Sequence, residues 1–308
     1  MEKESKVFVA GAGTLVGSAI LRKLKAEGFL GVLNQESGPA DLCDPIQVDA
    51  LFSRTAPEYV FLAAGKSGGI IANTNYPAEF IRDNLQINVN VIHSAYVHKV
   101  IKLLYVASSC CYPRICQQPM REEYLLTGPF EPTNEAYSIA KIAGIKLCQS
   151  YRQQYGVNFI SVIPPNLFGL GDDFHSKDSH VVAALIRKIH EAKELSNESV
   201  EIWGTGNPRR EFVYVDDLAD ACIFLMRKYD SGEPINAGGG SDLSIRELAE
   251  RVKKVVGFSG ELVFNSNQPD GMPIKLLDSS RLLGMGWKPK TSFSSALSAT
   301  YDWYLKKV

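Results

Sequence analysis

Residues 6–17 read KVFVAGAGTLVG, an apolar run followed directly by a segment with three glycines. The run over residues 6–10 has the composition of a parallel strand that is buried on both faces. After the glycines, apolar residues recur at helical spacing as far as about Gly28. Glycines between a strand and a helix let the backbone approach a pyrophosphate at the helix N-terminus. Three glycines are a weak signal, so an ordinary tight turn is the alternative interpretation.

Strand-like and helical segments alternate beyond this turn. Further strands are expected at residues 30–33, 59–63, 102–107 and 158–163, and helices at 84–97 and 134–155. This alternation predicts an α/β fold with a doubly wound parallel (Rossmann) sheet. Because the alternation changes after Pro164, we expect a dinucleotide-binding domain over residues 1–167 and a smaller α+β substrate-binding lobe over residues 168–308. Residues 213–230 are expected to cross back to the first domain.

The composition excludes several classes of protein. The 308 residues carry a formal charge of -1, so no global field favours nucleic acid or an anionic membrane. The apolar runs are far shorter than the roughly 20 residues that a membrane span needs. The charged N-terminus does not resemble a signal peptide, and the six cysteines lack zinc-binding spacing. We expect a cytoplasmic protein with free cysteines and no metal site.

Three residues have the arrangement of a carbonyl-reducing site. Tyr137 and Lys141 stand four apart, hence on one face of the helix expected from residue 134. Ser108 follows an apolar strand at the carboxyl end of the sheet, where open α/β folds bind ligands. In such a site Tyr137 donates a proton to the carbonyl oxygen, Lys141 lowers the pKa of the tyrosine, and Ser108 hydrogen-bonds the developing alkoxide. Packing or capping roles are the alternative.

Several long motifs are similar to those of the GDP-L-fucose synthase family, within the extended short-chain dehydrogenase/reductase superfamily. They include SSCCYP from Ser108, EPTNEAYSIAKIAGIKLC from Glu131, WGTGNPRREFVYVDDLADA from Trp203 and QPDGMPIKLLD from Gln268. The resemblance runs collinearly from about residue 6 to 305. It implies an enzyme that epimerises C3 and C5 of GDP-4-keto-6-deoxy-D-mannose and then reduces C4 with NADPH. It also implies a homodimer that pairs through the helices at 84–97 and 139–155.

The resemblance implies further site residues. The family exchanges protons at C3 and C5 with a cysteine and a histidine, which match Cys110 and His180; alone, these would be a buried filler and a helix cap. The contacts to the nucleotide sugar match Lys188, Trp203, Arg210 and Asp270. Lys188 stands where an arginine is expected, which keeps the charge and loses the bidentate fork.

The cofactor contacts implied by the glycine loop and by the resemblance are Gly11, Gly13, Thr14, Leu15, Val16, Gly17, Glu36, Asp41, Leu42, Ala64, Lys141, Pro164, Asn166, Leu167 and His180. Thr14 replaces the second glycine of the family loop, so Gly13 could serve by a shifted turn. The arginines expected for a 2′-phosphate are absent, with Gln35 and Ser37 near the second strand. NADP(H) is implied by the resemblance, and NAD(H) stays open because Glu36 could bind a ribose 2′-hydroxyl.

Changes beside the expected pocket, at Ser67, Cys111 and Pro165, leave other functions open. One is an epimerase and reductase acting on another nucleoside-diphosphate 4-keto-deoxy sugar, of the colitose or deoxyheptose type. Another is an epimerase similar to GDP-mannose 3,5-epimerase, which needs no net reductant. From a different class, the chain could be a non-catalytic dinucleotide-binding protein.

Overall fold

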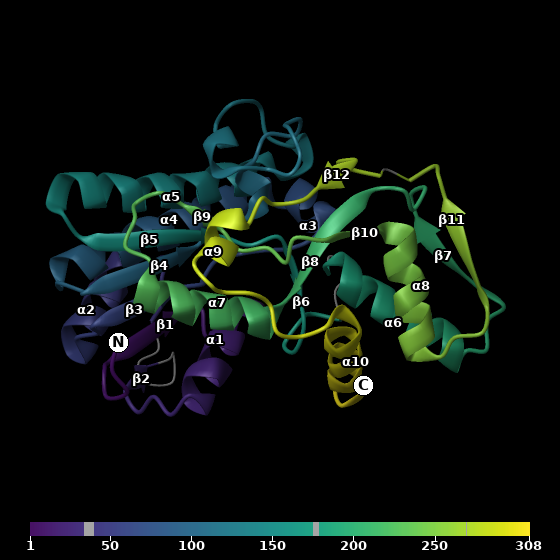
Figure 1. Ribbon diagram of the computed structural model, residues 1–308, viewed down its shortest axis with the longest axis horizontal. Helices are drawn as coiled ribbons and strands as arrows, with labels where there is room; N and C mark the ends of the chain where they lie inside the picture. The colour runs from purple at the N-terminus through teal and green to yellow at the C-terminus, as the bar shows by residue number, and fades with distance from the viewer. Residues whose placement is uncertain (34–39, 175–178, 269) are drawn as a thin grey trace.

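A six-stranded parallel sheet forms the centre of the larger part of the molecule (Figure 1). The computed structural model describes residues 1–33, 40–174, 179–268 and 270–308. The described strands of the large sheet lie in the order β2-β1-β3-β4-β5-β9. Their bounds are Val32–Leu33, Val7–Ala10, Tyr59–Leu62, Lys102–Val106, Asn158–Ile163 and Ile235–Asn236. The chain winds to one side of β1 with β2 and to the other side with β3, so the doubly wound parallel sheet is confirmed.

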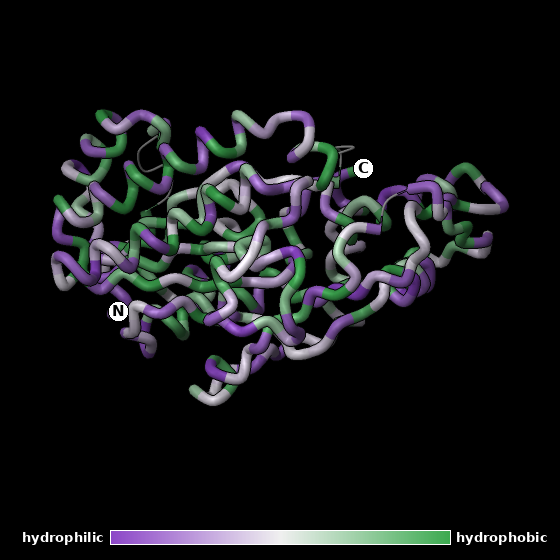
Figure 2. The backbone as a smooth tube through the Cα atoms, turned by 90° about the horizontal axis from the view of Figure 1, so that it is seen from above, coloured by the Kyte–Doolittle hydropathy of each residue, from purple (hydrophilic) through white to green (hydrophobic). Residues whose placement is uncertain are grey.

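Helices cover both faces of this sheet. One core cluster joins the strands to α2 (Pro45–Thr55), α4 (Pro77–Val97) and α5 (Glu135–Tyr155). The other joins them to α1 (Leu15–Ala26) and α7 (Val215–Lys228). The central strands are almost completely buried. Seen from above, hydrophobic segments run through the interior of the larger part of the molecule (Figure 2). Burial on both faces explains why these strands read as continuous apolar runs.

A second, smaller group of strands and helices lies beside the large sheet (Figure 1). Strand β8 (Arg209–Tyr214) pairs with β6 (Asn166–Phe168), β10 (Asp242–Ser244) and β12 (Ile274–Lys275), and β7 (Ser199–Trp203) pairs with β11 (Glu261–Asn265). A third core cluster holds α6 (Val181–Glu194), α8 (Ile245–Val256) and α10 (Phe293–Leu305). Short helices complete the fold at α3 (Ile70–Asn75) and α9 (Ser280–Gly284).

Some elements differ from expectation. Helix α4 begins at Pro77, seven residues before the start expected at Asn84, because proline is well suited to the first helical turn. Helix α2 was not expected, although Asp44 caps it and Pro45 begins it. No helix in the described part of the chain is long and apolar enough to cross a membrane.

Candidate active site

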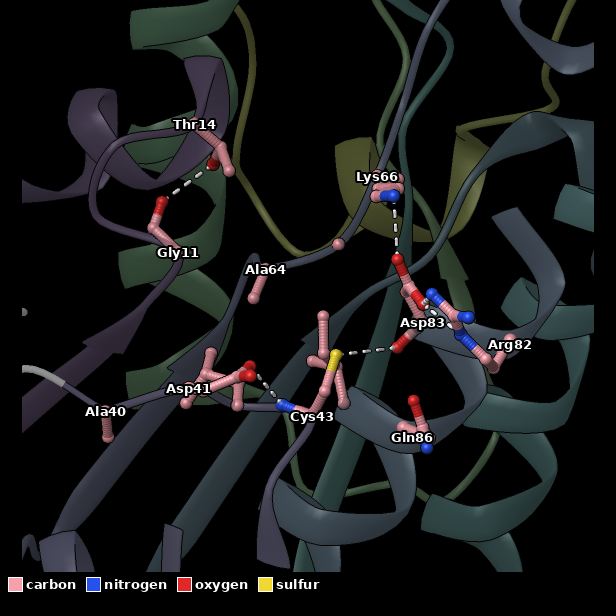
Figure 3. Close-up of a pocket in the computed structure, with 13 residues that line it drawn as sticks. Gly11, Thr14, Ala40, Asp41, Cys43, Ala64, Lys66, Arg82, Asp83 and Gln86 are labelled. Carbon is pink, nitrogen blue, oxygen red and sulfur yellow. Dashed lines mark hydrogen bonds and ion pairs between the residues drawn. The ribbon is translucent and has the colours of Figure 1, made fainter. Parts of the chain in front are cut away.

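A cavity of about 760 Å³ is lined by residues that follow β1, β2 and β3 and by residues of α4 (Figure 3). This is the topological switch point of the sheet, where ligands bind in open α/β folds. Five of the residues predicted to bind the cofactor line it: Gly11, Thr14, Asp41, Leu42 and Ala64. The position of the cavity and this lining fit a dinucleotide.

The turn between β1 and α1 shows which of its glycines are required. A Cβ atom on Gly17 would lie 2.0 Å from the carbonyl oxygen of Gly11, and Gly11 itself has a φ of +87°. Gly13 is exposed and a Cβ there would meet nothing within 4 Å. Thr14 caps α1, with its hydroxyl accepting the Gly17 N–H at 3.0 Å. The turn therefore keeps the helix N-terminus open for an anion, with a threonine cap where the family has a glycine.

The other predicted cofactor residues are placed in several ways. Gly13 lies in the turn between β1 and α1, and Leu15 and Val16 begin α1. Pro164 follows β5, and Asn166 and Leu167 lie in β6. Glu36 lies outside the described residues, as do Gln35 and Ser37.

Two cations that the sequence interpretation missed, Lys66 and Arg82, also line the cavity. Both are paired with the carboxylate of Asp83, at 2.8 Å from Lys66 and 2.6 Å from Arg82 (Figure 3). Lys66 also pairs with Glu79, so the two cations are matched by two carboxylates.

Ser108, Cys110, Tyr137 and Lys141 are brought together beside the end of β4. Ser108 follows the strand, and its hydroxyl accepts the backbone N–H of Cys110 at 3.2 Å. Helix α5 places Tyr137 and Lys141 on one face, with the Lys141 ammonium 5.8 Å from the centre of the Tyr137 ring. Tyr137 also lies near Ser108, which lowers the pKa of the phenol. Chain segments 27 residues or more apart thus meet at the carboxyl end of the sheet.

Burial shifts the pKa values of both Tyr137 and Lys141. Burial raises the pKa of Tyr137 well above its ordinary value, the nearby Cys110 adds to the rise, and the nearby Ser108 opposes it. Burial also lowers the pKa of Lys141 to about 8, and its ammonium donates to the carbonyl oxygen of Val106 at 3.0 Å. Burial is the largest influence on the pKa of Tyr137, and the expectation that Lys141 lowers this pKa stays a prediction. Tyr137 stays protonated and is available as an acid.

Two further residues contact the sulfur of Cys110. The Lys275 ammonium and the Asn134 side-chain amide each donate to it at 3.3 Å. Burial raises the pKa of the Cys110 thiol, but Lys275, Ser108 and Arg210 outweigh this effect and lower the pKa below its ordinary value. The sequence interpretation missed Lys275 and Asn134 as site residues, although both lie within the motifs that carried the resemblance.

His180 is placed in a separate contact. Its ring nitrogen Nδ1 lies 3.9 Å from the Asp172 carboxylate, and the His180 side chain is 44% exposed while that of Asp172 is 3% exposed. The second carboxylate oxygen of Asp172 has no hydrogen-bond partner among the described residues. At this distance the contact is an ion-pair contact and is too long for a hydrogen bond. Asp172 follows the PPNLFG motif and was also missed.

The four predicted contacts to the nucleotide sugar form two pairs. The Lys188 ammonium lies 6.0 Å from the ring centre of Trp203, which is half exposed. Arg210 is close to Asp270, whose negative charge opposes the fall that burial causes in the pKa of Arg210. The Asp270 carboxylate also accepts bonds from the backbone and hydroxyl of Thr205, at 2.7 and 2.8 Å. A cation with an exposed indole is suited to a phosphate beside an aromatic group.

Comparisons with known proteins agree with this geometry. The model of the NAD dependent epimerase/dehydratase family matches residues 7–238. GDP-L-fucose synthase 1 of Arabidopsis thaliana is 55% identical over 307 residues, which cover 100% of this chain and 95% of that protein. GDP-L-fucose synthase of Escherichia coli K12 is 46% identical, covering 98% of this chain and 97% of that protein.

A solved structure is also similar, a GDP-L-fucose synthetase from Naegleria fowleri bound to NADP. It has a TM-score of 0.92 and 30% identity, and the match covers 100% of this chain and 94% of that one. The resemblance inferred from the motifs is confirmed, and the cofactor is a nicotinamide dinucleotide. With the parallel sheet, the glycine turn and the match over most of its length, the chain belongs to the NAD dependent epimerase/dehydratase family of enzymes.

Proposed function

We propose that the chain is a GDP-L-fucose synthase, which epimerises C3 and C5 of GDP-4-keto-6-deoxy-D-mannose and then reduces C4. The observation that carries the proposal is that Ser108 accepts the backbone N–H of Cys110 and lies near the side chains of Cys110 and Tyr137, whose pKa values it lowers. A reducing group and a carbon acid/base are therefore held around one serine hydroxyl. Similarity to the fucose synthases over the full chain supports the choice of sugar.

For reduction, the C4 carbonyl oxygen lies between Ser108 and Tyr137. The bound dinucleotide supplies the hydride. Tyr137, which is protonated near neutral pH, donates a proton to the oxygen, and Ser108 stabilises the developing alkoxide by a hydrogen bond. The Lys141 ammonium compensates the charge that forms on the phenol oxygen.

For epimerisation, a proton must leave a carbon beside the carbonyl and another must arrive on the opposite face. Cys110 and His180 are the two groups for this exchange, each with a charged neighbour. Lys188 and Arg210 bind the pyrophosphate, Trp203 stacks on an apolar face of the ligand, and Asp270 accepts hydroxyl hydrogens. These roles rest on the family resemblance and on the chemistry of the side chains.

The cofactor proposed is NADP(H), with NAD(H) used as well. The NADP-bound relative supports the first choice. The second rests on the missing arginines and on the fact that Lys66 and Arg82, the cations lining the described cavity wall, are already paired with Asp83. A 2′-phosphate gains little from compensated cations. KM values for NADH and NADPH measured side by side test this, and a strong preference for NADPH would contradict dual use.

The assembly and location are part of the proposal. We expect a homodimer through α4 and α5, and a cytoplasmic enzyme, since its six free cysteines suit a reducing compartment. The division into domains 1–167 and 168–308, with 213–230 returning to the first, fits the packing of α7 against α1.

The test supplies the purified chain with GDP-4-keto-6-deoxy-D-mannose and either NADPH or NADH, and identifies the sugar formed. GDP-L-fucose with stoichiometric oxidation of the nicotinamide supports the proposal. Epimerised ketone without oxidation would indicate an epimerase alone. No reaction with this sugar, but reaction with a colitose-type or deoxyheptose precursor, would move the function to that substrate.

A further inference from the structure

The sulfur of Cys110 lies among hydrogen-bond donors. Lys275 and Asn134 both direct N–H groups at it, each at 3.3 Å. The amide oxygen of Asn134 is 3.2 Å from the Ser138 hydroxyl, which leaves its NH₂ group for the sulfur. A thiolate is a stronger hydrogen-bond acceptor than a thiol, so converging donors favour the deprotonated form.

Lys275 is only 9% exposed, and no carboxylate lies within ion-pair distance of it in the part of the chain that the structure describes. Its nearest neighbour in the sheet is another cation, because β12 and β8 pair Lys275 with Arg210. A buried ammonium beside a guanidinium is costly unless an anion compensates it. The sulfur of Cys110 is the group placed to do so.

Backbone hydrogen bonds join the residues after Lys275 to two other segments of the chain. The carbonyl oxygen of Leu276 accepts the Met120 N–H at 2.7 Å, and the Leu277 N–H donates to the buried carboxylate of Glu211 at 3.0 Å. These hydrogen bonds hold β12 where the Lys275 ammonium reaches the Cys110 sulfur, although 165 residues separate the two in sequence.

We propose that Lys275 is a positioning residue that keeps Cys110 deprotonated and so prepares it for epimerisation. The inference rests on the proposed function for the identity of the sugar and for the roles of Cys110 and His180 in epimerisation. The sulfur accepts a proton from the carbon beside the carbonyl, and the C–H electron pair passes into an enolate. A proton given by His180 to the opposite face restores the ketone, and both side chains then re-equilibrate with water.

Other charged or titratable groups influence the same sulfur, and the test must hold them constant. They are Arg210 on β8, Tyr137 and Lys141 on α5, and the neighbouring thiol of Cys111. Replacing Lys275 alone leaves all of them in place.

The experiment measures alkylation of Cys110 by iodoacetamide against pH, in the full chain without substrate, with each cysteine followed by peptide mapping. The wild-type protein should show an apparent pKa for Cys110 below the ordinary value of about 8.5. In Lys275→Met this pKa should rise, and alkylation at pH 7 should slow about tenfold for each unit of rise. Lys275→Arg should restore the rate, and Cys43 serves as an internal control.

An unchanged pH profile in Lys275→Met would overturn the inference, as would an ordinary or raised pKa for Cys110 in the wild type. The wild-type profile and the arginine variant decide the question even if the methionine variant does not fold. With the GDP-4-keto sugar, Lys275→Met should release mainly unepimerised, C4-reduced sugar. Failure of the wild type to turn over that sugar would contradict the proposed function and leave the thiol titration intact as a separate test.

Discussion

Lys141 is a buried cation in the candidate site, and burial of its charge lowers the stability of the folded protein. Its side chain is 6% exposed, and its ammonium donates to the carbonyl oxygen of Val106. The low pKa of about 8 means that the folded protein releases this proton more easily than the unfolded chain. Groups that a site requires are often retained despite such a penalty.

Lys141→Met should therefore stabilise the protein most below pH 8. The pKa of Lys141 is about 8 in the folded protein and 10.5 ordinarily, so between these values the unfolded chain binds more protons. The stability of the wild type then rises with pH across this window, by about 3 kcal/mol from this group. The advantage of the variant should shrink by that amount in urea unfolding compared at pH 7 and pH 10.5. A difference independent of pH would contradict the lowered pKa.

Tyr137→Phe should slow nicotinamide oxidation by about 10²–10⁴-fold, because the proton donor to the C4 oxygen is lost. Binding of the dinucleotide, followed by fluorescence titration, should change little. Tyr155→Phe is a matched control, since Tyr155 is a half-exposed tyrosine on the same helix. Retained turnover in Tyr137→Phe would leave the phenol without a catalytic role.

At the level of elements, substitutions in the turn between β1 and α1 can test which of its glycines the backbone needs. Gly17→Ala places a methyl 2.0 Å from the carbonyl oxygen of Gly11, so the turn must open, lowering Tm and dinucleotide affinity together. Gly13→Ala meets open space, so Tm should stay within about 2 °C, near the effect of a neutral surface change. Thermal melts and a cofactor titration of both variants separate the cases. An equal loss of Tm in both would show that the steric argument is wrong.

The strands that were predicted well from the sequence are those whose apolar residues form one unbroken run. Strands β3, β4 and β5 are buried on both faces, and their apolar runs match the observed strands to within one residue. The short strands β6 and β12 could not be predicted, because each has three residues or fewer and forms only by pairing with β8. Helix α2 had a capping signal in Asp44 and Pro45 that periodicity alone did not reveal.

At the level of the whole molecule, the candidate site is partly predictable for a physical reason. Ser108, Tyr137 and Lys141 follow from the rule that parallel strands end at one edge and that residues four apart share a helix face. The donation from Lys275 to Cys110 depends on β12 joining β8, a contact across 165 residues that no local pattern encodes. The pKa values of Tyr137 and Lys141 depend on burial, which only the packed structure determines.

The proposed homodimer makes the last prediction at this scale. Helices α4 and α5 expose Val89, Val97 and Tyr155, each 45–48% exposed, and Tyr96 stacks on Tyr155 with ring centres 4.2 Å apart. Two copies pairing these helices would cover this apolar surface, and a stable pair needs about 800 Å² from each partner. Sedimentation should show a dimer, and Val89→Glu should shift it to monomer because a carboxylate would be buried unpaired. Ile115→Glu, at an exposed position outside these helices, should leave the dimer intact. A monomeric wild type, or a Val89→Glu dimer as stable as the wild type, would place the interface elsewhere or exclude it.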